Sequence, residues 1–141
     1  MISTETWPQS AVRVWTLAQR FQKFLVVGVF GLAVNEGMLF VFKHLFGLPI
    51  AIASPIAIFI SMVVTFALNE FWTWHDRGNG RLLNRALMYG VVNSGGLLIN
   101  YAVLALLVRE TSMHYLMANL VGAGVAAVWN FGLNNMITWR A

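Results

Sequence analysis

Four segments of the chain are each long and apolar enough to cross a lipid bilayer, which constrains the fold more than any other feature. They cover residues 24–44, 50–72, 86–108 and 115–137. A bilayer core of about 30 Å requires about 20 apolar residues in a helix. Hydrophobic residues make up 59% of the chain and charged residues only 10%, so a soluble helical bundle would lack a polar surface. The sequence therefore predicts an all-α integral membrane protein with four transmembrane helices.

The polar segments between the predicted spans divide the chain into two helical hairpins. Residues 1–23 form a cytoplasmic or interfacial N-terminal segment, and residues 24–72 form the first two-helix repeat. A basic cytoplasmic loop over 73–85 leads into the second two-helix repeat, residues 86–141. Residues 11–23 are amphipathic, and this pattern fits either an interfacial helix or an N-terminal extension of the first span.

Basic residues near the ends of the spans predict the orientation of the protein. Those on one side of the membrane are Arg13, Arg20, Lys23, Arg77, Arg81, Arg85 and Arg140. Only Lys43 and Arg109 lie on the other side. Because cytoplasmic segments carry the excess of Lys and Arg, we expect both termini and the 73–85 loop to be cytoplasmic.

The two hairpins are related by an internal repeat. An offset of 65 residues aligns residues 20–75 with residues 85–140 without a gap. The identical pairs include Gly31/Gly96, Asn35/Asn100, Asn69/Asn134, Thr73/Thr138 and Trp74/Trp139. Each unit enters and leaves the membrane on the same side, so the sequence predicts parallel repeats related by an axis along the membrane normal.

The second helix of each repeat carries a small or polar residue at every fourth position. These residues are Ala53, Ala57, Ser61, Thr65 and Asn69 in one helix and Ala118, Gly122, Ala126, Asn130 and Asn134 in the other. Small residues let helix backbones approach closely, and amide side chains can hydrogen-bond across the contact. We expect these ladders to form packing seams, while the alternative is that their polar ends line a substrate path.

Polar residues inside the predicted spans are the candidate substrate contacts. They are Asn35, Glu36, Asn69, Asn100, Asn130 and Asn134. A carboxylate at the bilayer centre costs roughly 2.5–3.5 kcal/mol on insertion scales, so Glu36 should face a partner or a wet cavity. The alternative is a neutral Glu36 carboxyl that hydrogen-bonds to a neighbouring helix, with Asn100 as the candidate partner.

No motif for catalysis or cofactor binding is present in the sequence. The chain lacks a Walker A loop, a dinucleotide-binding fingerprint and a clustered set of carboxylates. It has no cysteine, and His44, His75 and His114 lie at three separate span ends without metal-ligand spacing. The net charge of +4 is too small and dispersed for a nucleic-acid binder. We therefore expect no enzyme, cofactor, metal site or nucleic-acid partner.

Three stretches carry a resemblance to a known family. They are KFLVVGVFGLAVNEGMLFVF (23–42), FALNEFWTW (66–74) and NFGLNNMITWR (130–140). They resemble the GtrA-like family of small four-span bacterial membrane proteins, which is linked to cell-surface polysaccharide synthesis. The chain departs from the family pattern at Glu70 and Asn135, where the family often has a basic residue.

The resemblance implies that the protein moves a polyprenyl-phosphate-linked sugar, such as undecaprenyl-phosphate glucose, across the bacterial inner membrane. Phosphate recognition needs cations, and the planar donor fork of Arg suits it. The candidates are Arg20, Lys23, Arg77, Arg81 and Arg85 on the cytoplasmic side, and Lys43 and Arg109 on the other.

Two other functions remain open at this point. The first is a non-transporting scaffold that recruits a membrane glycosyltransferase through its small-residue ladders. The second is a small-cation or drug exporter, which Glu36 alone suggests. Membrane lipids are expected partners in every case, and four thin helices leave little room for a glycolipid path, which favours a homo-oligomer.

Overall fold

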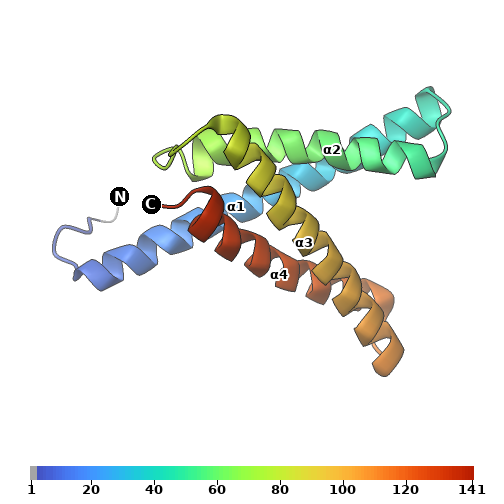
Figure 1. Ribbon diagram of the computed structural model, residues 1–141. Coiled ribbons are helices and arrows are strands. Elements are labelled where there is room, and N and C mark those ends of the chain that lie inside the picture. The colour runs from blue at the N-terminus through green and yellow to red at the C-terminus, as the bar shows by residue number, and fades with distance from the viewer. Residues whose placement is uncertain (1–2) are drawn as a thin grey trace. The chain divides into compact units, whose positions relative to one another are not determined.

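A computed structural model describes residues 3–141, so the first two residues of the 1–23 segment lie outside it. Residues 3–141 contain helices and turns and no β-strand (Figure 1). The α-helices are α1 (Gln9–Phe40), α2 (Ile50–Leu68), α3 (Leu82–Glu110) and α4 (Tyr115–Leu133). Three of them continue into a π-helical turn: η1 (Val41–Leu45), η2 (Asn69–Thr73) and η3 (Asn134–Thr138) follow α1, α2 and α4 respectively.

All four helices are long and apolar enough to cross a membrane. With their π-helical turns they contain 37, 24, 29 and 24 residues. Only 11–22% of the most apolar window of each helix is buried inside the protein, so most of the apolar side chains are left for lipid or for other protein surfaces in the membrane. The prediction of an all-α, multi-pass membrane protein is confirmed.

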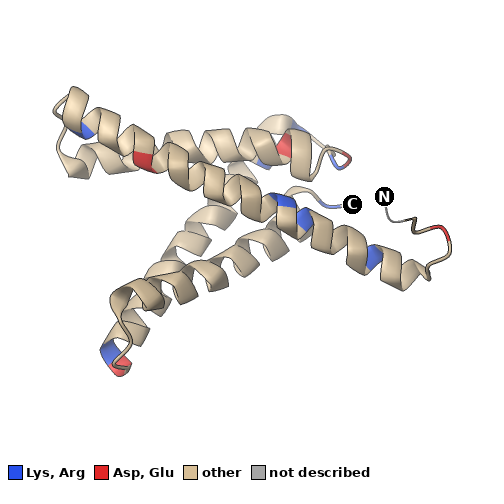
Figure 2. Ribbon diagram, turned by 180° about the vertical axis from the view of Figure 1, so that it is seen from behind, with Lys and Arg blue, Asp and Glu red and all other residues tan. Residues whose placement is uncertain are grey.

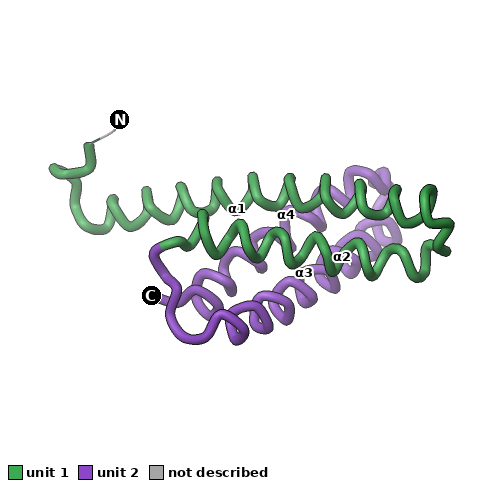
Figure 3. The backbone as a smooth tube through the Cα atoms, turned by 90° about the horizontal axis from the view of Figure 1, so that it is seen from above, with its two compact units in different colours: residues 1–75 green, residues 76–141 purple. Residues whose placement is uncertain are grey.

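The chain folds as two compact units, residues Met1–His75 and Asp76–Ala141 (Figure 3). Hairpin 1 is the antiparallel pair α1 and α2 with η1 and η2, and hairpin 2 is the pair α3 and α4 with η3. The open end of each hairpin is the end where the chain enters and leaves, and the turn end is the opposite one. At the turn end of hairpin 1, Gly47 takes a positive φ of 67° and Pro49 precedes the first residue of α2, a combination that suits a tight turn.

Hairpin 1 has a longer first helix than hairpin 2. Residues 9–23 are helical and continue into the rest of α1 without a break. At about 1.5 Å per residue, α1 with η1 is about 55 Å long. Arg20 lies opposite the end of η2, where its Nη1 donates to the backbone oxygen of Thr73 at 3.2 Å. The residues of α1 before Arg20 therefore extend beyond α2.

Small residues line the contact between the two helices of each hairpin. Ala53, Ala57 and Ala118 are completely buried. In hairpin 1 the Ser61 hydroxyl donates to the backbone oxygen of Gly31 at 2.6 Å. In hairpin 2 a Cβ at Gly96 would overlap the amide of Asn130. These contacts agree with the packing seams that the four-residue ladders predict.

Candidate functional site

The same arrangement of Asn, Thr and Trp residues is found at the open end of each hairpin. Thr73 Oγ1 donates to Asn69 Oδ1 at 2.8 Å, and the Trp74 backbone N–H donates to the Asn69 backbone oxygen at 2.9 Å. In hairpin 2 the corresponding distances, from Thr138 Oγ1 and the backbone N–H of Trp139 to Asn134, are 2.7 and 2.8 Å. The N–H of residue i+5 reaches the carbonyl of residue i, which produces the π-helical turn.

The tryptophan of each arrangement is a core residue. Trp74 and Trp139 are both 0% exposed. Trp74 packs edge-on against Phe24 with ring centroids 5.9 Å apart, and Trp139 packs in the same way against Tyr89 at 5.6 Å. Such pairs contribute about 0.5–1.5 kcal/mol beyond the area they bury. These residues therefore close the open end of each hairpin.

Two candidate substrate contacts, Asn69 and Asn134, belong to these arrangements. Both side chains are 0% exposed, and both accept the hydroxyl hydrogen of the threonine four residues later. A buried hydroxyl without an acceptor costs about 1–3 kcal/mol. Each asparagine therefore has a structural part in its hairpin, whatever else it contacts.

Arg20 and Arg85 occupy equivalent positions and are both buried, with 8% of each residue exposed. Arg20 donates to the carbonyl at the end of η2. Arg85 Nη1 donates to the backbone oxygens of Asn79 and Gly80 at 2.7 and 2.8 Å, which ties the inter-repeat loop to the start of α3. Gly80 allows this loop conformation because its φ is 77°.

The open end of hairpin 2 brings together several of the candidate phosphate contacts. Arg77 is half-buried, and its Nη1 donates to Asn135 Oδ1 at 3.0 Å and to the Trp139 backbone oxygen at 3.4 Å. The Asn79 amide donates to the backbone oxygen of Arg140 at 3.1 Å. The loop is thus fixed to both α3 and the C-terminal segment, and Arg81 is exposed directly before α3.

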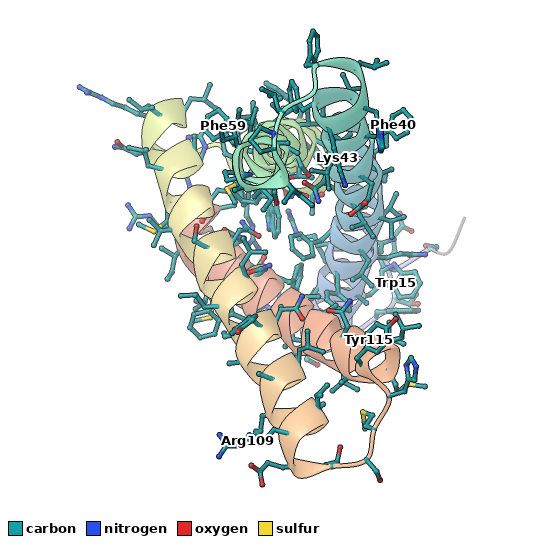
Figure 4. The ribbon with its side chains drawn as sticks, turned by 90° about the vertical axis from the view of Figure 1, so that its right-hand side faces the viewer. Trp15, Phe40, Lys43, Phe59, Arg109 and Tyr115 are labelled. Atoms are coloured by element: carbon teal, nitrogen blue, oxygen red, sulfur yellow. The ribbon has the colours of Figure 1, made fainter. Side chains whose placement is uncertain are left out.

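The remaining basic candidates are placed singly. Lys23 Nζ lies 5.7 Å from the centre of the Trp72 ring, within cation–π range, at the open end of hairpin 1. Lys43 is exposed in η1, at the turn end of hairpin 1. Arg109 projects from the turn end of α3 and pairs with the exposed Glu110 at 3.2 Å (Figure 4). Lys, Arg, Asp and Glu occupy few positions along the helices, and most of the ribbon consists of other residues (Figure 2).

Glu70 distinguishes the open end of hairpin 1 from that of hairpin 2. It is buried beside Asn69 in η2, and the equivalent residue in hairpin 2 is the neutral Asn135. The open end of hairpin 2 contains the acidic Asp76, which is exposed in the loop. Each open end therefore has one acidic residue, and hairpin 2 has more positive charge there because it has four arginines where hairpin 1 has Arg20 and Lys23.

Asn100 and Asn130 lie in the middle of the hairpin 2 seam, each against a glycine of the opposite helix. The Asn100 amide lies against Gly122 and the Asn130 amide against Gly96. Both Oδ1 atoms are buried without a hydrogen-bond partner among residues 3–141, and so is Nδ2 of Asn134. Buried amide atoms in this state are expected to bind water or a ligand hydroxyl.

The two polar candidates of α1 are more accessible than the buried amide oxygens of hairpin 2. Asn35 is half-buried and Glu36 is exposed on the surface of hairpin 1. Within residues 3–141, Glu36 has neither a hydrogen bond nor an ion pair. The described residues also contain no group of three or more His, Asp or Glu side chains that could hold a metal ion.

Sequence reasoning missed Trp129 as a candidate residue. Its indole Nε1 donates to the backbone oxygen of Val92 at 3.2 Å, and a Cβ at Gly95 would lie 3.1 Å from the same nitrogen. The residue is nevertheless 41% exposed. The offset of 65 gives a signal for this pair, because hairpin 1 has Phe30 and Val64 where hairpin 2 has Gly95 and Trp129.

Comparison with known proteins places this arrangement in a family. The chain is 35% identical over 120 residues to a dolichol-phosphate mannosyltransferase from Pyrococcus furiosus. The similar region covers 85% of this chain but only 34% of that protein, so the chain spans about a third of its length. Residues 23–139 match the family described as GtrA/DPMS, transmembrane domain. Since that match covers most of the sequence, the chain belongs to the GtrA/DPMS transmembrane-domain family.

Proposed function

We propose that the protein translocates a polyprenyl-phosphate-linked sugar across the bacterial inner membrane, for the synthesis or modification of a cell-surface polysaccharide. The observation that carries the proposal is the family match over residues 23–139, together with similarity to a protein named for a polyprenyl-phosphate sugar. The chain itself performs no bond-making step in this proposal, and both of its termini lie in the cytoplasm.

The charge at the open end of hairpin 2 supports a site for the lipid phosphate. Arg77 and Arg85 are held by carbonyl and amide oxygens, so little side-chain freedom is lost when they bind an anion. Arg81 is exposed between them in sequence. A guanidinium binds phosphate through two parallel hydrogen bonds, and these three residues are the proposed cytoplasmic contacts.

Polar side chains along the hairpins support a path for the sugar. The prenyl chain stays in lipid while the sugar passes the amides of Asn100 and Asn130, whose oxygens can accept from sugar hydroxyls. Asn35 and Glu36 are the proposed sugar contacts of hairpin 1. Lys43 and Arg109, at the turn ends, receive the phosphate on the far side. A substrate or ion gradient supplies the driving force.

Purified protein in liposomes tests this proposal directly. Labelled polyprenyl-phosphate glucose and polyprenyl-phosphate mannose are placed in the membrane, and the fraction that a membrane-impermeant oxidant reaches is followed over time. We expect the protein alone to accelerate exchange between the leaflets, and Arg77→Gln to slow it. Arg13→Gln is the matched control, because Arg13 is an exposed arginine on the extension of α1.

A scaffold that recruits a membrane glycosyltransferase is the second candidate function. The observation in its favour is that two thirds of the similar mannosyltransferase lie outside the shared region. Exchange that requires an added glycosyltransferase, or no exchange at all, would favour the scaffold over the translocator. Proton-coupled efflux of organic cations from the same liposomes would instead favour an exporter that uses Glu36.

A further inference from the structure

Trp129 is at an unusual depth for an exposed tryptophan. It lies in the middle third of the Tyr115–Thr138 helix, which is long and apolar enough to cross a membrane. Tryptophan is enriched at the two membrane interfaces, where the ring is apolar and the N–H is hydrated. Trp129 instead bonds its N–H to a backbone carbonyl of α3 and exposes 41% of the residue at mid-depth.

The position of the ring is fixed by two contacts with α3. The hydrogen bond from Nε1 to Val92 O fixes the polar edge. The absence of a side chain at Gly95 allows the indole nitrogen to lie close to α3, since a Cβ there would lie 3.1 Å from Nε1. The ring therefore needs little ordering when a ligand packs against it, and this lowers the entropic cost of binding.

The neighbouring polar atoms complete a site for a sugar. Asn130 follows Trp129 directly, and its Oδ1 lacks a hydrogen-bond partner among residues 3–141, as does that of Asn100. A pyranose ring has an apolar C–H face, which the negative face of an aromatic ring attracts, and hydroxyls at its edge that donate to carbonyl oxygens. An aromatic ring beside amide oxygens offers both kinds of contact.

We propose that Trp129 is a stacking platform for the sugar ring of the lipid-linked substrate, and that Asn130 and Asn100 accept hydrogen bonds from its hydroxyls. This inference rests on the proposed substrate class. It assigns the sugar to hairpin 2, because hairpin 1 has Val64 at the position of Trp129 and Thr65 at that of Asn130.

Equilibrium binding separates this role from packing and from translocation. Purified protein in detergent is titrated with polyprenyl-phosphate glucose, polyprenyl-phosphate mannose and sugar-free polyprenyl phosphate. Trp129→Leu should weaken binding of at least one sugar-linked lipid by about fivefold, the order expected for the loss of one aromatic contact. Binding of the sugar-free lipid should stay the same, because the phosphate contacts are unchanged.

A repeat-swap variant keeps the experiment decisive if Trp129→Leu folds poorly. Gly95→Phe combined with Trp129→Val gives hairpin 2 the pair that hairpin 1 has at Phe30 and Val64, so the space between the helices stays filled while the indole and its hydrogen bond to Val92 are lost. The same selective loss is expected. Phe59→Leu, which removes an exposed ring from α2 (Figure 4), is the matched control and should leave all affinities unchanged.

Either of two results would overturn the platform. One is an equal loss of affinity for sugar-linked and sugar-free lipid in the swap variant; the other is a wild-type protein that binds both sugar-linked lipids no more tightly than the sugar-free one. Sugar-selective binding that depends on Trp129 would support the platform even without exchange in liposomes. That combination would reject the translocation proposal alone.

Discussion

Hairpins 1 and 2 have the same framework and differ in the polar groups that this framework leaves without partners. Each has a buried arginine, a π-helical turn and a buried tryptophan at its open end. In the hairpin 1 seam, the Ser61 hydroxyl is bonded to a backbone oxygen. In the hairpin 2 seam, three amide atoms have no partner among residues 3–141.

The difference teaches that residues repeated in both hairpins and residues unique to one have separate explanations. Asn69/Asn134, Thr73/Thr138 and Trp74/Trp139 make the same contacts twice, so the fold of a hairpin accounts for them. Trp129 and Glu36 each occur in one hairpin only, and the equivalent residues in the other hairpin are Val64 and Tyr101. A packing requirement common to both hairpins cannot account for these two, and they are the first places to look for function.

The largest expected effect on stability comes from the point in the hairpin 2 seam where a glycine lies against the backbone of the opposite helix. A Cβ at Gly122 would lie 2.5 Å from Asn100 Oδ1 and 2.8 Å from the Asn100 backbone oxygen. Backbone cannot move aside without separating the helices, so Gly122→Ala should lower the free energy of unfolding by about 1–3 kcal/mol. Unfolding in mixed micelles, followed by circular dichroism, measures this change.

Gly124 and Ala57 provide the controls for that comparison. Gly124 has open space around it, so Gly124→Ala should not destabilise and should gain up to about 1 kcal/mol from helix propensity. Hairpin 1 already has Ala57 at the position of Gly122, and it accommodates the Cβ there. Equal losses for Gly122→Ala and Gly124→Ala would show that the seam is not tighter in hairpin 2.

The next largest effect is expected on phosphate binding, and it tests whether the greater positive charge at the open end of hairpin 2 has a function. Arg81→Gln should weaken binding of sugar-free polyprenyl phosphate by about tenfold, because a charge-assisted hydrogen bond contributes about 1.5–3 kcal/mol. Binding in detergent at low and high salt measures it, and the difference should shrink as salt screens the charges. Arg13→Gln should change neither value; if it weakens binding as much, general surface charge explains the affinity.

A smaller and equal effect is expected at the two threonines. Thr73→Val and Thr138→Val each remove the hydroxyl that donates to the asparagine of the same π-helical turn. Each should lower the free energy of unfolding by about 1 kcal/mol. Because they lie in separate hairpins, the double variant should lose about the sum of the two. A loss in one hairpin only would break the equivalence of the repeats.

Much of the fold could be predicted because membrane helices leave a strong one-dimensional signal. The four apolar segments and the offset of 65 together indicate four helices in two similar hairpins, and the four-residue ladders indicate which face of α2 and α4 packs. These predictions depend on length, hydropathy and side-chain size, all of which can be read along a chain.

The site was less predictable because its features depend on contacts between residues that are far apart in the sequence but lie close together within each hairpin. Arg20 and Arg85 are at span ends in the sequence, where charges normally set topology, yet both are buried against backbone carbonyls. The π-helical turns depend on hydrogen bonds that cannot be inferred from the periodicity of apolar residues in the sequence. Trp129 was missed because an apolar residue in a span is expected to face lipid, and only the exchange with Phe30 and Val64 distinguishes it.

Glu36 is expected to show the smallest effect, and it tests whether hairpin 1 contributes to function at all. Its carboxyl is exposed on α1 without a partner among residues 3–141, at a depth where an uncompensated charge costs roughly 2.5–3.5 kcal/mol. That cost has to be offset by something outside the hairpin 1 seam, and the passing sugar or a carried proton would do so. Hairpin 2 has Tyr101 at the position equivalent to Glu36, so it has no carboxyl group there.

Glu36→Gln keeps the shape and most of the hydrogen bonding of the side chain but removes its titration. We expect the variant to be expressed normally and to differ from the wild type in the rate at which it moves the sugar-linked lipid or in the dependence of that rate on pH. Exchange rates in liposomes between pH 5 and pH 9 measure this difference. Identical pH profiles would remove Glu36 from the mechanism and leave hairpin 2 as the part of the chain that handles the sugar.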